Sequence, residues 1–186
     1  MRNRRWFSAL IFVIPAVLAV ATIAVADDGG RNFGRASMNG YQEAPPISTV
    51  GSGSFEASVN SAGDEINYTL SYRDLEAPVT QAHVHFGQRS VSGGIIAWLC
   101  EGTLPSPSTS TPTCPEAAGG SVSGTITALE VIGPAGQGIA ATEFAELVRA
   151  VRAGAVYANV HTTKFGGGEI RGQVNDRNQR DEDDDD

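Results

Sequence analysis

The sequence predicts an all-β protein, an antiparallel sandwich or barrel with one short helix. Short runs that alternate apolar and polar residues recur between residues 36 and 174, separated by glycine- and proline-containing turns. Alternation with a period of two is typical of strands with one buried and one solvated side. Many short strands joined by such turns are typical of sandwiches and barrels. One segment alone, near residues 142–153, has apolar residues at helical spacing.

The alternation is clearest in two neighbouring runs, residues 54–59 and 66–72. Between them, residues 60–64 read Asn-Ser-Ala-Gly-Asp, a composition that favours a hairpin loop. Five further strands are predicted at Gln81–Phe86, Ile95–Cys100, Ser121–Ile126, Val156–His161 and Glu169–Val174.

The helix has recognisable ends. Thr142 is predicted as its N-cap and Gly154 as its stop, with glutamates near the start and arginines near the end, as the helix dipole favours. Its apolar stripe consists of Phe144, Leu147, Val148 and Val151. We expect the helix to pack over one end of the sheets, and we assign it no chemistry.

The N-terminus predicts export. A cationic start is followed by an apolar run over Trp6–Ile23 and by Ala24-Val25-Ala26, which together are typical of a cleaved signal peptide over residues 1–26. A membrane anchor is the alternative, and Pro15 and the Ala-x-Ala site favour cleavage over it. We therefore expect a secreted, periplasmic or cell-envelope protein with no membrane segment after cleavage.

The chain carries a net negative charge, part of it in a C-terminal run of acidic residues. The 186 residues carry a net charge of −8, and removal of the three arginines of the signal peptide takes it to −11. Such a charge excludes nucleic acid as a partner, since binding to it needs basic patches. Residues 176–186 form an acidic tail that we expect to be disordered. Residues 27–35 are predicted as a flexible lead-in, and residues 36–175 as the single folded domain.

The two cysteines, Cys100 and Cys114, flank a stretch rich in proline, serine and threonine. In an oxidising compartment an isolated pair of this kind predicts a disulfide. A pair of free thiols is the alternative, but the spacing is not that of a redox motif.

The chain has three histidines, His83, His85 and His161. On a strand, the first two point to the same face, while Ala82, Val84 and Phe86 take the other. Two imidazoles on one strand and a third from another strand would complete a three-nitrogen site for copper or zinc, with Glu43 or Glu169 as further ligands. The alternative is that the histidines are structural and bond to loop backbones.

A weak internal echo links two of these histidines. Val84-His85 is followed by Gly93-Gly94-Ile95-Ile96, and Val160-His161 by Gly167-Gly168-Glu169-Ile170. Each is a strand that ends in histidine, a glycine-rich turn and a second strand. The echo suggests two similar hairpins that face each other across the core. No nucleophile elbow, phosphate-binding loop or Cys-x-x-Cys motif is present, so the sequence does not favour an enzyme.

Four motifs carry a family resemblance: Gly40–Pro46, Ala82–Gly87, Tyr157–Thr162 and Gly168–Gln173. In this order they resemble the CHRD domain, first described in chordin and found in many bacterial secreted proteins. The resemblance covers residues 36–174. It implies an immunoglobulin-like or superoxide-dismutase-like antiparallel β-sandwich and no established activity. The growth-factor binding of chordin belongs chiefly to other modules, and nothing here matches them.

The family motifs fall on the histidines and glutamates already named and add Asn159, Thr162 and Arg171. The His-Val-His strand also resembles the copper-site strand of copper/zinc superoxide dismutases, although three histidines cannot supply a full dismutase set. The sequence thus favours an exported, non-enzymatic binding or surface module for an extracytoplasmic protein or surface ligand. The alternative is a copper- or zinc-binding protein with a three-histidine site.

Overall fold

The computed structural model describes residues 32–115 and 118–174. The predicted signal peptide, the first part of the lead-in and the acidic tail lie outside the described residues. Within the described part, no helix has both the length and the apolar character needed to cross a bilayer.

Eight strands form one antiparallel sheet in the order β5-β4-β7-β8-β1-β2-β3-β6. Their bounds are β1 Asn32–Asn39, β2 Ser52–Val59, β3 Ile66–Arg73, β4 Val79–Phe86, β5 Gly94–Glu101, β6 Gly120–Ile126, β7 Val156–Thr162 and β8 Ile170–Val174. Within the described residues there is one α-helix, α1 Phe144–Arg152, and there are three short 3-10 helices, η1 Gly40–Gln42, η2 Ala128–Glu130 and η3 Ala135–Gln137.

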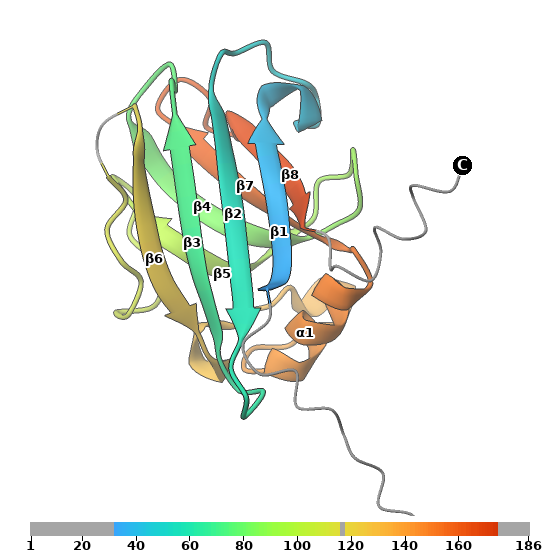
Figure 1. Cartoon of the computed structure of the whole chain (residues 1–186). Helices are drawn as coiled ribbons and strands as arrows, with labels where there is room; N and C mark the ends of the chain where they lie inside the picture. The colour runs from blue at the N-terminus through green and yellow to red at the C-terminus, as the bar shows by residue number, and fades with distance from the viewer. Residues whose placement is uncertain (1–31, 116–117, 175–186) are drawn as a thin grey trace, which may run out of the picture.

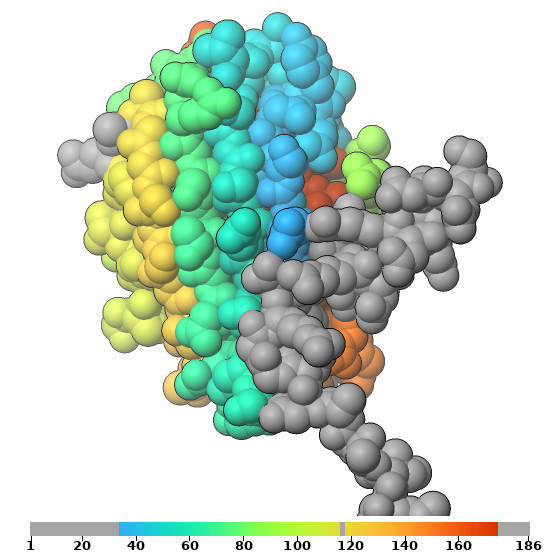
Figure 2. Space-filling view, viewed as in Figure 1, coloured from blue at the N-terminus to red at the C-terminus, as the bar shows by residue number. Residues whose placement is uncertain are grey.

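The sheet curls into a nearly closed barrel with two layers (Figure 1). Strands β6, β3, β2 and β1 form the front layer, and β8, β7, β4 and β5 form the layer behind it. Figure 2 shows the outer side of the front layer, on which the four strands lie side by side. The all-β antiparallel prediction with one short helix is confirmed.

Apolar side chains from both layers fill the space between them. Each predicted alternation places its apolar members there, and in β3 the buried residues are Ile66, Tyr68, Leu70 and Tyr72. Strand β4 contributes Ala82 and Val84 to the same core, and Phe86 packs against it. The core therefore takes the side of β4 opposite to the histidines, as predicted.

Strand β1 corrects the predicted domain boundary. Residues 32–35 belong to β1, which pairs with β2 and joins the two layers through β8, whereas the sequence indicated a flexible lead-in there. This segment is polar and rich in glycine, so it lacks a clear period-two pattern. Its pairing partners, not its own composition, make it a strand.

The start of α1 also differs from the prediction. The N-cap residue is Glu143, and Thr142 before it has a positive φ of 70°. Thr142 cannot cap the helix in that conformation, and its N–H donates instead to the carbonyl of Val131 at 2.8 Å. The predicted stop is correct, because Gly154 has a φ of 62° after the last helical turn.

A disulfide joins Cys100 and Cys114, as the sequence predicts. Cys100 lies on β5, one edge of the sheet, and Cys114 lies in the segment that leads to β6, the other edge. A buried hydrogen bond from the Tyr68 hydroxyl to the carbonyl of Leu99 also links the two layers here. The disulfide thus ties β5 to the segment that precedes β6, on the side where the barrel nearly closes.

Loss of this disulfide should destabilise the domain. Cysteines 14 positions apart close a loop for which chain-entropy estimates give about 3 kcal/mol. We expect the Cys100→Ser/Cys114→Ser variant to lose that much unfolding free energy in urea denaturation. An unchanged unfolding midpoint would contradict the view that this link stabilises the domain.

Candidate functional site

The outer face of the back layer is polar and nevertheless buried. Residues that pair directly across antiparallel strands share one face, and here they form two rows, His83–Asn159–Arg171 and His85–Tyr157–Gln173. The alternate residues of β4 and β7 face the apolar core. We call the outer side of β4, β7 and β8, with these two rows and His161, the polar face.

Three loops cover the polar face, and side chains from the sheet hold each of them. Arg171 donates to the carbonyls of Gln42 and Val91. Gln173 donates to the carbonyl of Gly87 at 3.0 Å, and His161 contacts the carbonyl of Gly166 at 3.0 Å. The polar side chains therefore serve as the hydrogen-bond partners of loop backbone that would otherwise be buried without partners.

The three histidines meet on the polar face. One ring nitrogen from each lies within 4.8 Å of the others, and Nδ1 of His83 lies 3.3 Å from Nε2 of His161. Exposed fractions are 0% for His83 and 7% each for His85 and His161. The predicted juxtaposition of the His-x-His pair with a third histidine is therefore present in the structure.

Hydrogen bonds to glycine carbonyls fix the tautomers of two rings. Nδ1 of His85 lies 3.0 Å from the carbonyl of Gly93, and Nδ1 of His161 lies 3.0 Å from that of Gly166. A carbonyl can only accept, so both Nδ1 atoms carry the proton and both Nε2 atoms carry a lone pair. This is the arrangement by which proteins orient metal-binding imidazoles.

The same contacts explain the internal echo in the sequence. In each copy, a histidine at the end of a strand donates to a glycine carbonyl of the turn that follows. The two hairpins, β4–β5 and β7–β8, lie side by side in one sheet through the β4–β7 pairing. The expectation that they face each other across the core is wrong.

Burial keeps the imidazoles neutral. It lowers the pKa of His83 to about 2, with a further contribution from the neighbouring His161 and His85. Burial lowers the pKa of His85 to about 4 despite its bond to Gly93, and it lowers the pKa of His161 despite its bond to Gly166. Neutral imidazole is the form that binds a metal ion.

The spacing suits a transition metal. Zinc–nitrogen bonds of about 2.0–2.1 Å at tetrahedral angles place two nitrogens about 3.3–3.4 Å apart, and the His83–His161 pair is 3.3 Å apart. Nε2 of His85 and Nε2 of His83 are buried and have no hydrogen-bond partner. Buried ring nitrogens without partners are costly. A cation between Nδ1 of His83 and Nε2 of His161 would satisfy Nε2 of His85, whose Nδ1 already bonds to Gly93, whereas Nε2 of His83 lies on the other side of its ring.

Glu43 does not belong to the histidine cluster, which consists of His83, His85 and His161. Its Oε1 accepts a hydrogen bond of 2.6 Å from Nδ2 of Asn159. Burial raises the pKa of Glu43 to about 7, against the opposing effects of the Arg171 charge and the Asn159 bond. Gly168, with a φ of 126°, lies against both side chains, and a Cβ there would come within 2.7 Å of Glu43 Oε1.

Glu169 is also outside the cluster and is fully buried. Its Oε1 accepts from the Thr49 hydroxyl and from the backbone N–H of Glu76, both at 2.8 Å. Thr162, equally buried, accepts from the N–H of Phe165 at 3.2 Å. These two residues hold loops in place, and the structure brings neither glutamate together with the histidines.

Two aromatic residues, Tyr157 and Trp98, complete the site, and neither was predicted from the sequence as a site residue. Tyr157 stacks on His85 at 4.7 Å between ring centroids, and the Arg171 guanidinium lies 4.5 Å from the centroid of the Tyr157 ring. Trp98 packs edge-on against His83 at 4.4 Å. The alternation of β7 could have revealed Tyr157, because it places Tyr157 on the same face as Asn159 and His161.

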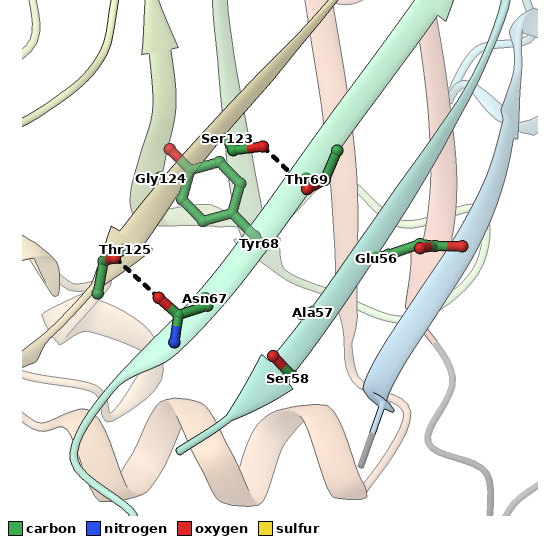
Figure 3. A pocket seen from close by; sticks show the side chains of 9 residues that line it. All are labelled: Glu56, Ala57, Ser58, Asn67, Tyr68, Thr69, Ser123, Gly124 and Thr125. Carbon is green, nitrogen blue, oxygen red and sulfur yellow. Dashed lines mark hydrogen bonds between the residues drawn. The ribbon is translucent and has the colours of Figure 1, made fainter. Parts of the chain in front are cut away.

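A hollow of about 470 Å³ lies on the outer side of β2, β3 and β6, in the layer opposite to the histidine cluster (Figure 3). Its hydroxyl and amide groups bond to each other across the strands, Thr69 to Ser123 at 2.9 Å and Thr125 to Asn67 at 3.0 Å. With its polar groups so paired, and with Glu56 as its one charged lining residue, the hollow offers no comparable ligand set.

Residues 34–174 match the CHRD domain family. The chain belongs to the CHRD domain family. No curated protein and no solved structure matches it.

The segments that carry the family resemblance meet at the polar face of the CHRD domain. The first is the loop of η1, the second is β4, the third is β7, and the fourth is the turn into β8. They are far apart in the sequence, and the order of strands β4-β7-β8-β1 brings them together. The family pattern therefore describes one side of the sheet and its covering loops.

The buried imidazoles make the stability of the metal-free domain depend on pH. Unfolded histidines titrate near pH 6.5, and the folded pKa values are lower, so the unfolded chain binds more protons below that pH. Glu43 acts in the opposite sense between pH 7 and about 4.5, because its folded pKa is raised. Near pH 5 the unfolded chain therefore binds up to about two more protons than the folded chain.

We therefore expect the unfolding free energy to fall by about 2–3 kcal/mol per pH unit near pH 5. Urea denaturation of chelator-treated protein between pH 7 and 5 measures this slope. In His85→Phe the slope should be smaller by about 1.4 kcal/mol per pH unit. A wild-type stability that is flat or rises as the pH falls would show that the histidines are not buried in neutral form.

Proposed function

We propose that this CHRD domain protein is an extracytoplasmic, non-enzymatic metal-binding protein that holds one copper or zinc ion with His83, His85 and His161. One observation carries the proposal: three neutral, buried imidazoles from two strands converge, with ring nitrogens within 4.8 Å of one another. The bonds from Nδ1 of His85 and His161 to loop carbonyls already orient two of the rings.

The donor set favours copper or zinc. Imidazole nitrogens suit zinc, copper, iron and nickel, whereas calcium and magnesium prefer oxygen ligands. No carboxylate among the described residues belongs to the cluster. A closing movement of about 1.5 Å would bring the widest nitrogen–nitrogen separation in the group, at most 4.8 Å, to the tetrahedral value.

The burial of the cluster favours binding over catalysis. A catalytic metal keeps a position open to water or substrate. Here His83 is fully buried, and loops that bond to His85 and His161 cover the site. A bound ion would strengthen the attachment of these loops to the sheet, so we propose that the CHRD domain presents them as a surface for an extracytoplasmic partner.

Sequence features support the location. Residues 1–26 have the composition of a cleaved signal peptide. The Cys100–Cys114 disulfide suits an oxidising compartment such as the periplasm, the cell envelope or the medium.

Metal content tests the proposal. Mature protein purified without a histidine tag should contain about one copper or zinc ion per chain by elemental mass spectrometry, before or after reconstitution. The His83→Ala/His85→Ala/His161→Ala variant should lose it. A chain that ends at residue 175 is the matched control, because it lacks the acidic tail and should keep the ion.

The same experiment can overturn the proposal. An absence of stoichiometric copper or zinc in the wild type after reconstitution would make the histidines structural. Metal that persists in the triple variant and disappears with the tail would assign binding to the aspartates. Circular dichroism of each variant establishes that the fold is intact before the comparison is made.

Ion binding should also stabilise the CHRD domain. A ligand present at 100 times its dissociation constant stabilises the folded state by about 2.7 kcal/mol. Thermal unfolding with and without zinc or copper measures this effect. We expect a higher melting temperature for the wild type and no shift for His161→Ala, whose side chain is one of the three ligands.

A further inference from the structure

A second, smaller hollow lies beside the polar face, and the proposed metal site does not use it. It has a volume of about 140 Å³, and its lining residues are Tyr41, Gln42, Arg89, Ser90, Arg171 and Gln173. Two guanidinium groups line it, and no carboxylate does. Two like charges around one hollow repel each other, so an anion between them would be stabilised by both.

Arg171 is held as a rigid donor. It is 3% exposed, its Nε and Nη1 donate to the carbonyls of Gln42 and Val91, and its guanidinium stacks on Tyr157. Its Nη2 is buried and has no hydrogen-bond partner. A fixed arginine with an unused donor loses little conformational entropy when it binds an oxyanion.

The opposite side of the hollow is free to adjust. Arg89 is exposed and makes no ion pair or hydrogen bond within residues 32–115 and 118–174. Tyr41 is 70% exposed and supplies a hydroxyl. These two exposed side chains can reorient toward a ligand in the hollow.

The size of the hollow restricts the ligand. Pockets for drug-sized molecules measure about 300–1,000 Å³, and this one measures about 140 Å³. It can therefore take one small group, and the donors around it select an oxyanion. We propose that Arg89 and Arg171 form a binding site for a single carboxylate or phosphate group.

Inorganic phosphate is the probe. Isothermal titration calorimetry at low ionic strength, on mature protein stripped of metal, should show saturable binding that weakens as salt is added. Arg89→Gln should weaken it by about 10-fold or more, because a charge-assisted contact is lost. Arg73→Gln is the matched control, since Arg73 is an exposed arginine paired with Asp74 elsewhere, and it should leave the affinity unchanged.

A chain that ends at residue 175 identifies the source of the oxyanion. A rise of 10-fold or more in phosphate affinity would show that carboxylates of the chain's own tail occupy the site, and an unchanged affinity would show that it takes an external ligand. Absence of binding to both the full and the shortened chain, or equal losses in Arg89→Gln and Arg73→Gln, would overturn the proposal. Neither of these two overturning results depends on the histidines, so neither would contradict the proposed metal site.

Discussion

The burial of polar side chains on the outer face of β4, β7 and β8 is the constraint on which the rest of the structure depends. Loop backbone lies over this face, and its carbonyls need donors because water is excluded. The sheet supplies them from side chains: His85 bonds to Gly93, His161 to Gly166, and Gln173 to Gly87. An apolar residue at any of these positions would leave a loop carbonyl without its partner. The domain thus has two interiors, an apolar one between the layers and a polar one beneath the loops, and the candidate sites belong to the second.

The apolar interior could be predicted from the sequence, because the alternation that specifies it lies within each strand. Period-two alternation in residues 54–59 and 66–72 corresponds to β2 and β3 directly, and the apolar members lie in the core. Prediction failed where the conformation depends on distant partners. Residues 32–35 have no alternation, and they become part of β1 through pairing with β2. Thr142 has the chemistry of an N-cap, but its N–H bonds to Val131 and its backbone takes a left-handed conformation that sequence pattern alone does not indicate.

The second interior could be predicted only in part. The spacing of His83 and His85 places both on one face whatever the fold, so that pair was predictable. The approach of His161 depends on the β4–β7 pairing, which joins Gln81 to His161 across 80 positions of sequence. Residue type alone could not decide whether Glu43 or Glu169 would be a metal ligand, since a carboxylate suits that role in either position. Glu43 bonds to Asn159 on β7, and Glu169 bonds to Thr49 and to the N–H of Glu76. Hydrogen bonds that form only in the folded chain thus take up Oε1 of each carboxylate.

The two proposed sites share one stack of side chains, and this has an energetic consequence. His85 stacks on one side of Tyr157, and the Arg171 guanidinium stacks on the same ring system at 4.5 Å. Burial is the main cause of the lowered pKa of His85, and the positive charge of Arg171 adds to it. The same charge must oppose a metal cation at that histidine. An oxyanion at Arg171 would offset that repulsion. Linkage requires the effect to be reciprocal, so each ligand would strengthen the binding of the other. A cation beneath the loops and an anion at their rim would then stabilise the same covered face.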